Sequence, residues 1–276
     1  MTQLPGVNVP TDDVRHDLGQ PALALAGVSV YYYDTPALED ISFQLGRGER
    51  VAVIGPNGAG KSTLFNVIAG VVRPTRGRVN IYGSSPEVHV CIAYVPQRSQ
   101  VDWQFPANVA EAVMMGRVGK IGLFRRAKRR DWERVYEALN LVGLAHLAKR
   151  QLGALSGGQQ QRVFIARALA QEAELMLMDE PFSGLDVTSQ EDLFAILEML
   201  RQRQVTVMVA THDLNQAIER FDRLLLLKQR LIGFGPPGEV FRAPLLSQAY
   251  GGYAHVMAPP QLPISQTNGS RVSGHG

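Results

Sequence analysis

Hydrophobic and polar positions follow different periods in different parts of the chain. The segment LALAGVSVYYY alternates between apolar and polar positions, which predicts a strand. Short apolar runs predict strands that are buried on both faces, as in a parallel sheet: RVAVIG, ELMLMDEP and VTVMVATHD. Helical spacing marks another set of segments: KSTLFNVIAGVV, FRRAKRRDWERVYEALNLVGL, QEDLFAILEMLRQ and LNQAIERF. Strands that alternate with helices predict an α/β fold with a mainly parallel sheet.

The two ends of the chain lack this patterning. Residues 1–20 are rich in Pro, Asp and Gly, which predicts a flexible leader. Residues 258–276 are rich in Pro, Ser and Gly, which predicts a disordered tail. Residues 21–257, between these ends, are enough for one large domain or for a domain that contains an insertion.

Composition narrows the class of protein. A hydrophobic content of 45% and a charged content of 19% are ordinary for a globular protein. The longest apolar runs, such as Leu175–Met178 and Leu224–Leu227, have the length of strands and are too short to cross a bilayer. The N-terminus lacks the basic and apolar regions of a secretory signal, and the single cysteine, Cys91, excludes an intramolecular disulfide. These features favour a cytoplasmic protein, and a net charge of +3 is too small to indicate nucleic-acid binding by itself.

A glycine-rich loop is the first candidate for chemistry. The sequence GPNGAGKS, at Gly55–Ser62, matches G-x-x-x-x-G-K-[ST] and lies between a predicted strand and a predicted helix. Its glycines let backbone N–H groups point at phosphate oxygens, and the start of the helix adds the positive end of its dipole. We expect Lys61 to reach the β- and γ-phosphates and the Ser62 hydroxyl to bind Mg²⁺. The alternative is a tight turn with a chance lysine, which the flanking strand and helix disfavour.

Two carboxylates end the apolar strand in LMLMDE, which we expect beside the strand of the phosphate loop. Asp179 is suited to hold Mg²⁺, directly or through a water molecule. Glu180 is suited to act as a general base, or to orient the water that attacks the γ-phosphate. The alternative is a strand end held by salt bridges, which is disfavoured beside a phosphate loop.

A second anion site is predicted where LSGGQ precedes the amphipathic helix QQRVFIARALA. With this motif the chain resembles the ATP-binding subunits of ABC transporters over about Leu23 to Phe241. The resemblance implies a P-loop NTPase fold: an ABC ATPase core with a mainly parallel sheet, an antiparallel β part and an inserted helical subdomain at about residues 98–170. It implies ATP and Mg²⁺ as cofactors and these ATP-binding residues: Gly55, Pro56, Asn57, Gly58, Ala59, Gly60, Lys61, Ser62 and Thr63.

The resemblance also assigns roles outside the phosphate loop. Gln97 is implied as the Q-loop glutamine that reaches Mg²⁺, Asp186 belongs to the D-loop SGLD, and His212 is implied as the switch histidine. His212 would hold the γ-phosphate and the attacking water, although alone it would be interpreted as an ordinary half-buried histidine. An aromatic side chain is expected to stack on adenine, and counting back from the loop favours Tyr32, with Tyr31 and Tyr33 as alternatives.

The resemblance further implies a head-to-tail dimer with a second copy of the chain. Each ATP would lie between the phosphate loop of one copy and the signature of the other. Ser156 and Gly158 would touch the γ-phosphate in trans, as members of the signature residues Leu155, Ser156, Gly157, Gly158 and Gln159.

The segment YVPQRSQVDWQFPANVAEAVMMGR mixes large apolar residues with charged ones. The resemblance implies that Arg98 to Met115 form the groove that receives a helix of an integral membrane permease, and an apolar floor with a polar rim is the anatomy of such an interface. The floor would comprise Trp103, Phe105, Met114 and Met115, and the rim Arg98 and Asp102. The alternative is a folded loop whose tryptophan fills a local core. The following basic run, at residues 125–130, is interpreted as a solvated helix face or as a contact with lipid headgroups or the membrane partner.

Within the family, the sequences VDW-x-FP and VMMGR are similar to the manganese and iron branch of metal importers. The resemblance implies an ATPase that energises manganese import at the cytoplasmic face of the inner membrane, with zinc, iron or chelated iron as alternatives. A metal-binding substrate protein would be an indirect partner. The competing class is an ABC ATPase that acts on nucleic acid or ribosomes. It is disfavoured because the chain has one ATPase module and no long coiled-coil insertion, so no nucleic-acid partner is expected.

Overall fold

The computed structural model describes residues 19–86, 91–122 and 125–251. The predicted tail, and the predicted leader up to residue 18, lie outside the described residues. Within the described ranges, no helix combines the length and the apolar character that crossing a membrane requires.

A six-stranded sheet forms the centre of the fold, in the order β5-β6-β7-β3-β8-β9. All neighbours are parallel except β8 and β9, which form an antiparallel pair. Every residue of β6 and β7 is buried, which explains their continuous apolar runs. The strands are β3 (Arg50–Ile54), β5 (Ile92–Val95), β6 (Leu175–Asp179), β7 (Thr206–Ala210), β8 (Arg223–Lys228) and β9 (Arg230–Gly235).

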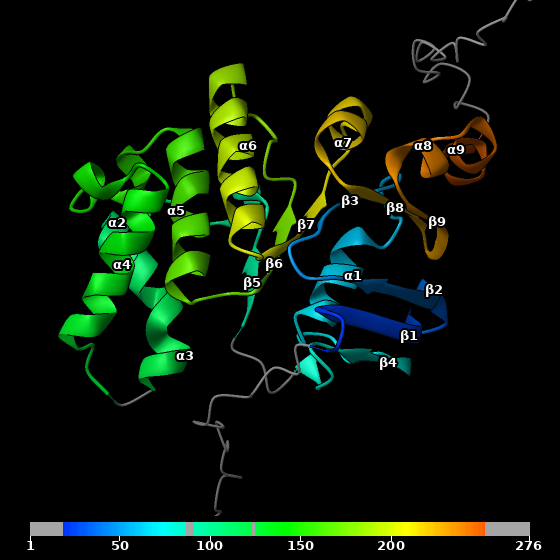
Figure 1. Cartoon of the computed structure of the whole chain (residues 1–276), viewed down its shortest axis with the longest axis horizontal. Coiled ribbons are helices and arrows are strands. Elements are labelled where there is room, and N and C mark those ends of the chain that lie inside the picture. The colour runs from blue at the N-terminus through cyan, green and yellow to red at the C-terminus, as the bar shows by residue number, and fades with distance from the viewer. Residues whose placement is uncertain (1–18, 87–90, 123–124, 252–276) are drawn as a thin grey trace, which may run out of the picture.

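A three-stranded antiparallel sheet lies beside it, in the order β2-β1-β4. Its strands are β1 (Leu23–Tyr32), β2 (Thr35–Leu45) and β4 (Arg76–Asn80). Helix α1 (Lys61–Ile68) lies between the two sheets and buries Leu64 and Phe65 in a core that both sheets share (Figure 1). The α1 packing fixes the position of the loop that precedes it.

The remaining helices lie in two groups. Helices α2 (Val109–Met114), α3 (Val118–Ile121), α4 (Arg129–Leu141) and α5 (Gly157–Ala170) lie on the β5 side, within the range predicted for the helical subdomain (Figure 1). The other group is α6 (Val187–Gln202), α7 (Leu214–Arg220), α8 (Pro237–Val240) and α9 (Ala243–Tyr250). Short 3-10 turns occupy Arg98–Gln100, Met115–Arg117, Ala145–Leu147 and Leu152–Ala154.

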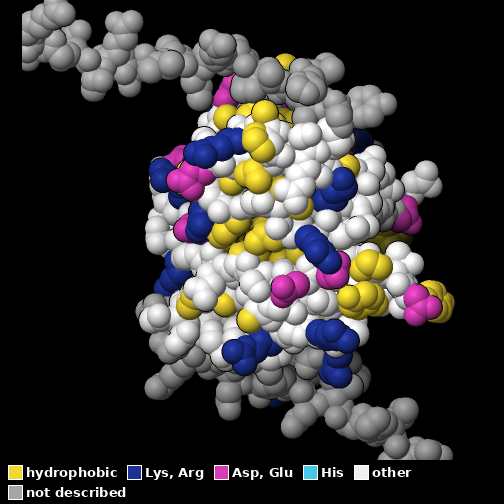
Figure 2. All heavy atoms as spheres, turned by 90° about the vertical axis from the view of Figure 1, so that its right-hand side faces the viewer, with side chains coloured by type: hydrophobic (Ala, Val, Ile, Leu, Met, Phe, Trp, Pro, Cys, Tyr) yellow, Lys and Arg dark blue, Asp and Glu magenta, His cyan; other side chains and the backbone are white. Residues whose placement is uncertain are grey.

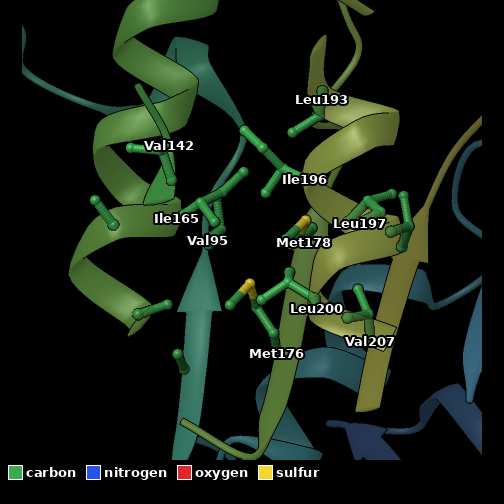
Figure 3. Close-up of a cluster of buried hydrophobic side chains, with 14 of the residues drawn as sticks. Val95, Val142, Ile165, Met176, Met178, Leu193, Ile196, Leu197, Leu200 and Val207 are labelled. Carbon is green, nitrogen blue, oxygen red and sulfur yellow. The ribbon is translucent and has the colours of Figure 1, made fainter. Parts of the chain in front are cut away.

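The α5 helix is joined to the sheet by a common core. Ile165 of α5, Val95 of β5, Met178 of β6 and Ile196 of α6 lie together in it (Figure 3). On the side of the molecule that carries β9 and α9, the surface mixes apolar, basic and acidic side chains (Figure 2). There Arg230 of β9 pairs with Glu39 of β2 at 2.7 Å and ties the two sheets together.

The bounds of three helix predictions need correction. The helix predicted over residues 61–72 is α1 and ends at Ile68, shortly before Gly70 at a φ of 74°. The helix predicted to start before the basic run begins only at Arg129, where the N–H of Lys128 donates to the Asp131 carboxylate at 2.8 Å. Arg125, Arg126 and Lys128 therefore precede α4, while Arg129 and Arg130 form its first turn. Helix α6 begins earlier than predicted, because the Asp186 carboxylate caps it by accepting from the N–H of Ser189 at 2.8 Å.

Candidate active site

The phosphate loop connects β3 to α1, and two of its glycines lie where the surrounding backbone leaves no room for a side chain. A Cβ on Gly55 would lie 2.1 Å from the carbonyl oxygen of Leu227, and φ at this residue is 155°. A Cβ on Gly60 would lie 2.5 Å from the carbonyl oxygen of Ala37, at a φ of 97°. The glycines that the motif requires are thus enforced by contacts with β2 and β8, and they leave the start of α1 open toward the loop.

Lys61 extends over the loop. Its Nζ donates to the carbonyl oxygens of Gly55 at 2.8 Å and Pro56 at 3.1 Å. Burial lowers the pKa of Lys61, against the opposing charges of Glu180 and Asp179. The turn beneath it is closed by the N–H of Ala59, which donates to Pro56 O at 3.1 Å. The ammonium group is therefore held at the place where phosphate oxygens would replace the two carbonyl groups.

Ser62 and Asp179 come together, although the strand that ends in Asp179 was expected beside the phosphate-loop strand and is instead separated from it: β7 pairs with both and lies between β6 and β3. The Ser62 hydroxyl donates to Asp179 Oδ2 at 2.9 Å, and Asp179 is 5% exposed. A third residue joins them, because the Tyr94 hydroxyl donates to the same Oδ2 at 3.3 Å. A carboxylate and a hydroxyl are hard oxygen ligands that fit Mg²⁺. The sequence analysis did not identify Tyr94, whose only signal is a hydroxyl-bearing side chain within an apolar strand.

Glu180, Gln97 and His212 meet at the carboxyl ends of three neighbouring strands. Gln97 Nε2 donates to Glu180 Oε2 at 3.3 Å, and His212 Nδ1 lies 3.5 Å from Glu180 Oε1. Glu180 has a φ of 46°, and its N–H donates to the carbonyl oxygen of Ala210 at 2.9 Å. The carboxyl ends of parallel strands are where α/β proteins bind ligands, so this cluster is in the right place to act on a bound phosphate.

The signature motif begins α5. Ser156 is the N-cap: its hydroxyl accepts from the N–H of Gln159 at 3.3 Å, and the Gln159 side chain accepts from the N–H of Ser156 at 3.0 Å. Leu155 is buried before the cap. A Cβ on Gly158 would lie 2.5 Å from Ser189 Oγ, so this glycine lets the start of α5 approach α6 closely.

Arg98 supports the same motif from behind. Its Nε donates to Gln160 Oε1 at 2.8 Å, and a Cβ on Gly157 would lie 3.2 Å from its Cζ. The guanidinium group predicted for the rim of a permease groove is therefore directed at the first turn of α5. Asp186 is also engaged locally, since hydrogen bonds from Ser189 lower the pKa of its carboxyl.

The other residues predicted to contact a permease lie in different surroundings. Trp103 packs edge-to-face on Phe164, with ring centroids 5.4 Å apart, and its Nε1–H donates to the carbonyl oxygen of Arg98 at 2.9 Å. Met114 is half-buried against the core, whereas Phe105 is 49% and Met115 44% exposed. Asp102 is exposed and accepts from the N–H of Gln104 at 2.9 Å.

A surface groove of about 220 Å³ lies between β5, the Met115 turn and α5. Its lining residues are Ala93, Tyr94, Met115, Gly116, Gly119, Phe164, Arg167, Ala168 and Gln171. Among the predicted permease contacts, Met115 lines this groove, and Trp103 supports it indirectly through Phe164.

The candidate adenine-stacking residues lie at the end of β1. Tyr32 is 49% exposed, Tyr33 is fully exposed, and Tyr31 is half-buried. Tyr33 has a φ of 54° in the turn between β1 and β2. Tyr32 remains the favoured candidate because it offers an exposed ring that is anchored in a strand.

Comparison with known proteins agrees with this arrangement. The family model described as "ABC transporter" matches residues 38–183. The "Manganese transport system ATP-binding protein MntB" of Bacillus subtilis (strain 168) is 47% identical over 229 residues, which are 83% of this chain and 92% of that protein. The "Zinc transport system ATP-binding protein TroB" of Treponema pallidum (strain Nichols) is 42% identical over 84% of this chain and 87% of that protein.

A solved structure of a metal-chelate type ABC transporter in an inward-facing conformation contains a similar chain. It has a TM-score of 0.75 and 33% identity, and the match covers 84% of this chain and 89% of that chain. The match of the family model, the identity to these relatives and the shared fold lead to one conclusion: this chain belongs to the family of ATP-binding proteins of ABC transporters.

Proposed function

We propose that this chain hydrolyses ATP to drive a membrane permease that imports divalent metal, with manganese as the metal. The observation that supports hydrolysis most directly is the meeting of Gln97, Glu180 and His212 beside the Ser62–Asp179 pair. Manganese is supported by the 47% identity to a manganese transport ATP-binding protein over 83% of the chain. Residues 21–257 would form one ABC ATPase domain, with its helical subdomain at about residues 98–170.

Binding of ATP would begin at the phosphate loop. Backbone N–H groups of residues 55–63 and the start of α1 would hold the phosphates, and Lys61 would turn from its carbonyl partners to the β- and γ-phosphates. Ser62, Asp179 and Gln97 have the oxygen atoms needed to hold Mg²⁺. When bound, Mg²⁺ would neutralise charge that develops on the β- and γ-phosphate oxygens.

Hydrolysis would be directed by the Glu180 carboxylate. It would orient a water molecule and accept its proton as the water oxygen bonds to the γ-phosphorus and the bond to the β–γ bridging oxygen breaks. His212 lies on the other side of Glu180 from Gln97, where its ring can donate to a γ-phosphate oxygen. ADP and phosphate are the products.

A second copy of the chain would complete each site. The start of α5 is a capped helix N-terminus suited to bind an anion. The phosphate loop of the same chain already supplies a helix N-terminus for one ATP, so the start of α5 is left for the ATP of a second copy. In a head-to-tail dimer, the signature of one copy would face the phosphate loop of the other, with Ser156 and Gly158 at the γ-phosphate. Asp186, at the start of α6, would lie near the same dimer interface.

The permease would dock on the groove between β5 and α5. Met115 provides an exposed apolar contact there, and Arg167 stands over the Phe164 ring at 4.5 Å, which gives the groove a charged edge. The chain would thus be a peripheral subunit at the cytoplasmic face of the inner membrane. A metal-binding substrate protein would deliver the ion to the permease on the opposite face.

Metal content of cells tests this proposal. Deletion of the gene is expected to lower cell manganese, as measured by mass spectrometry, and a plasmid copy or added Mn²⁺ should restore growth. If only the zinc or iron content of the cells falls, the proposed metal is wrong, but the proposal of a transport ATPase still holds. If manganese, zinc and iron all stay unchanged, the import function itself is contradicted.

A further inference from the structure

Asp179 receives hydrogen bonds from two hydroxyl groups. One comes from Ser62 at 2.9 Å and the other from Tyr94 at 3.3 Å, and both reach the same oxygen, Oδ2. The phosphate-loop motif accounts for the serine. Tyr94 also lines the groove between β5 and α5, but nothing in the roles proposed above requires its hydroxyl.

The Tyr94 side chain is held firmly in this position. Its ring packs edge-to-face on Phe65 of α1, with centroids 6.5 Å apart and an interplanar angle of 78°. Its carbonyl oxygen accepts from Arg167 of α5 at 3.4 Å, and β5 pairs it in register with Leu177 of β6. The hydroxyl is therefore placed by α1, α5 and the sheet together.

The Tyr94 hydroxyl is the donor of this hydrogen bond, and the Asp179 carboxylate oxygen accepts it. Asp179 is itself 5% exposed, so the partners that the protein supplies largely determine the orientation of its carboxylate. Hydrogen bonds to a metal-binding carboxylate fix its orientation, and their loss weakens metal binding.

We propose that Tyr94 is a positioning residue for the Mg²⁺ that accompanies ATP: its hydroxyl fixes the orientation of the Asp179 carboxylate, which would hold the metal. The inference rests on the ATPase function proposed above. It separates two roles within one short segment, because Gln97 would contact the metal, whereas Tyr94 acts only through Asp179. It predicts a defect in the use of Mg²⁺ rather than in the binding of ATP itself.

The test is Tyr94→Phe in the full chain, which keeps the ring and its packing and removes the hydroxyl. Binding of a fluorescent ATP analogue is measured in EDTA and then across a Mg²⁺ titration, and ATPase activity is measured across the same titration. In EDTA we expect the affinity of the variant to stay within about twofold of wild type. The half-saturating Mg²⁺ concentration is expected to rise about tenfold in both titrations.

The matched control is Tyr136→Phe, which removes the same hydroxyl from a tyrosine that is 42% exposed on α4. It should leave both titrations unchanged. An unchanged or lower Mg²⁺ requirement in Tyr94→Phe overturns the inference, and so does an equal loss of binding in EDTA, which indicates a general structural role. A wild-type chain that binds the analogue but hydrolyses no ATP contradicts the proposed function instead.

Discussion

Glu180 occupies an unusual backbone conformation for a residue that bears a side chain. Its φ of 46° is stabilised by the hydrogen bond from its N–H to Ala210, at the end of the neighbouring strand. Such strain is concentrated at functional sites, where surrounding structure compensates for it. Here it accompanies the placement of the carboxylate between Gln97 and His212, consistent with a role in orienting water.

Glu180→Gln should therefore separate ATP binding from hydrolysis. The amide keeps the shape of the side chain but cannot accept the proton of water, so we expect ATPase activity to fall at least about a hundredfold. Affinity for ATP should stay near that of wild type, and dimers should accumulate with ATP. Glu219→Gln, at an exposed position on α7, is the control and should hydrolyse ATP normally. Near-normal turnover in Glu180→Gln would exclude the carboxylate from this role.

The sequence indicates some candidate site residues more directly than others. The phosphate-loop pattern identified Lys61 and Ser62 because all its members lie within a few positions of each other. Gln97 and His212 have no such local pattern, and only the family resemblance singled them out. The contacts of Tyr94 with Asp179 and of Arg98 with Gln160 join residues 85 and 62 positions apart, and no local period encodes them.

At the scale of elements, the groove between β5 and α5 offers a test of docking. Met115→Glu would place a charge in the groove, and a docked permease would have to bury that charge without a partner. We expect affinity for the permease, measured by co-purification in detergent, to fall at least about tenfold. ATPase activity of the isolated chain should be unchanged.

Val71→Glu is the control for this experiment, because Val71 is an apolar residue that is 73% exposed just beyond α1. It should bind the permease as wild type does. Equal binding by both variants would place the permease elsewhere on the surface. Loss of folding in Met115→Glu would instead show that the side chain belongs to the core.

A group of ion pairs ties the helical elements to each other. Glu172, just after α5, pairs with Arg117 at 3.2 Å and with Arg134 of α4 at 3.3 Å, and it accepts a hydrogen bond from Lys120 of α3. Burial raises the pKa of Glu172, but the hydrogen bonds and charges of Lys120 and Arg117 outweigh it and hold the pKa below its ordinary value of 4.5.

This lowered pKa has a defined effect on stability. The stabilising contribution is complete above pH 4.5, the ordinary value, and is lost as the pH falls through the lower pKa of the folded state. Thermal melting should show Glu172→Gln below wild type at about pH 7, and the difference should shrink below about pH 4. A difference in melting temperature that stays constant or grows in acid would contradict this. Glu219→Gln should show no difference at either pH.

Element predictions succeeded where the local hydrophobic pattern has one interpretation. The continuous apolar runs of β6 and β7 predicted buried strands, and the structure buries every residue of both. The α4 boundary was missed because the basic run continues the helical pattern, whereas the Lys128–Asp131 contact starts the helix later. The short helices α8 and α9 and strand β9 gave no clear period, and their packing against β8 stabilises them.

At the scale of the whole molecule, the two sheets position different parts of the candidate active site. The antiparallel sheet and α1 support the phosphate loop, and the parallel sheet brings Asp179, Glu180 and His212 to one edge. The parallel character of the main sheet was predictable from the continuous apolar runs of its strands. The comparisons confirm the ABC ATPase fold. The strand order was not predictable, because each parallel crossover can join distant strands and no residue period records which strands become neighbours.

Uptake of radioactive manganese most directly tests whether hydrolysis by this chain drives manganese import. Cells that lack the gene would receive a plasmid with wild type or Glu180→Gln, and immunoblots would confirm equal amounts of both chains. We predict that wild type restores manganese uptake and that Glu180→Gln leaves it at the level of the empty plasmid. Restored uptake with Glu180→Gln, or no effect of wild type, would contradict an ATP-driven manganese importer powered by this chain.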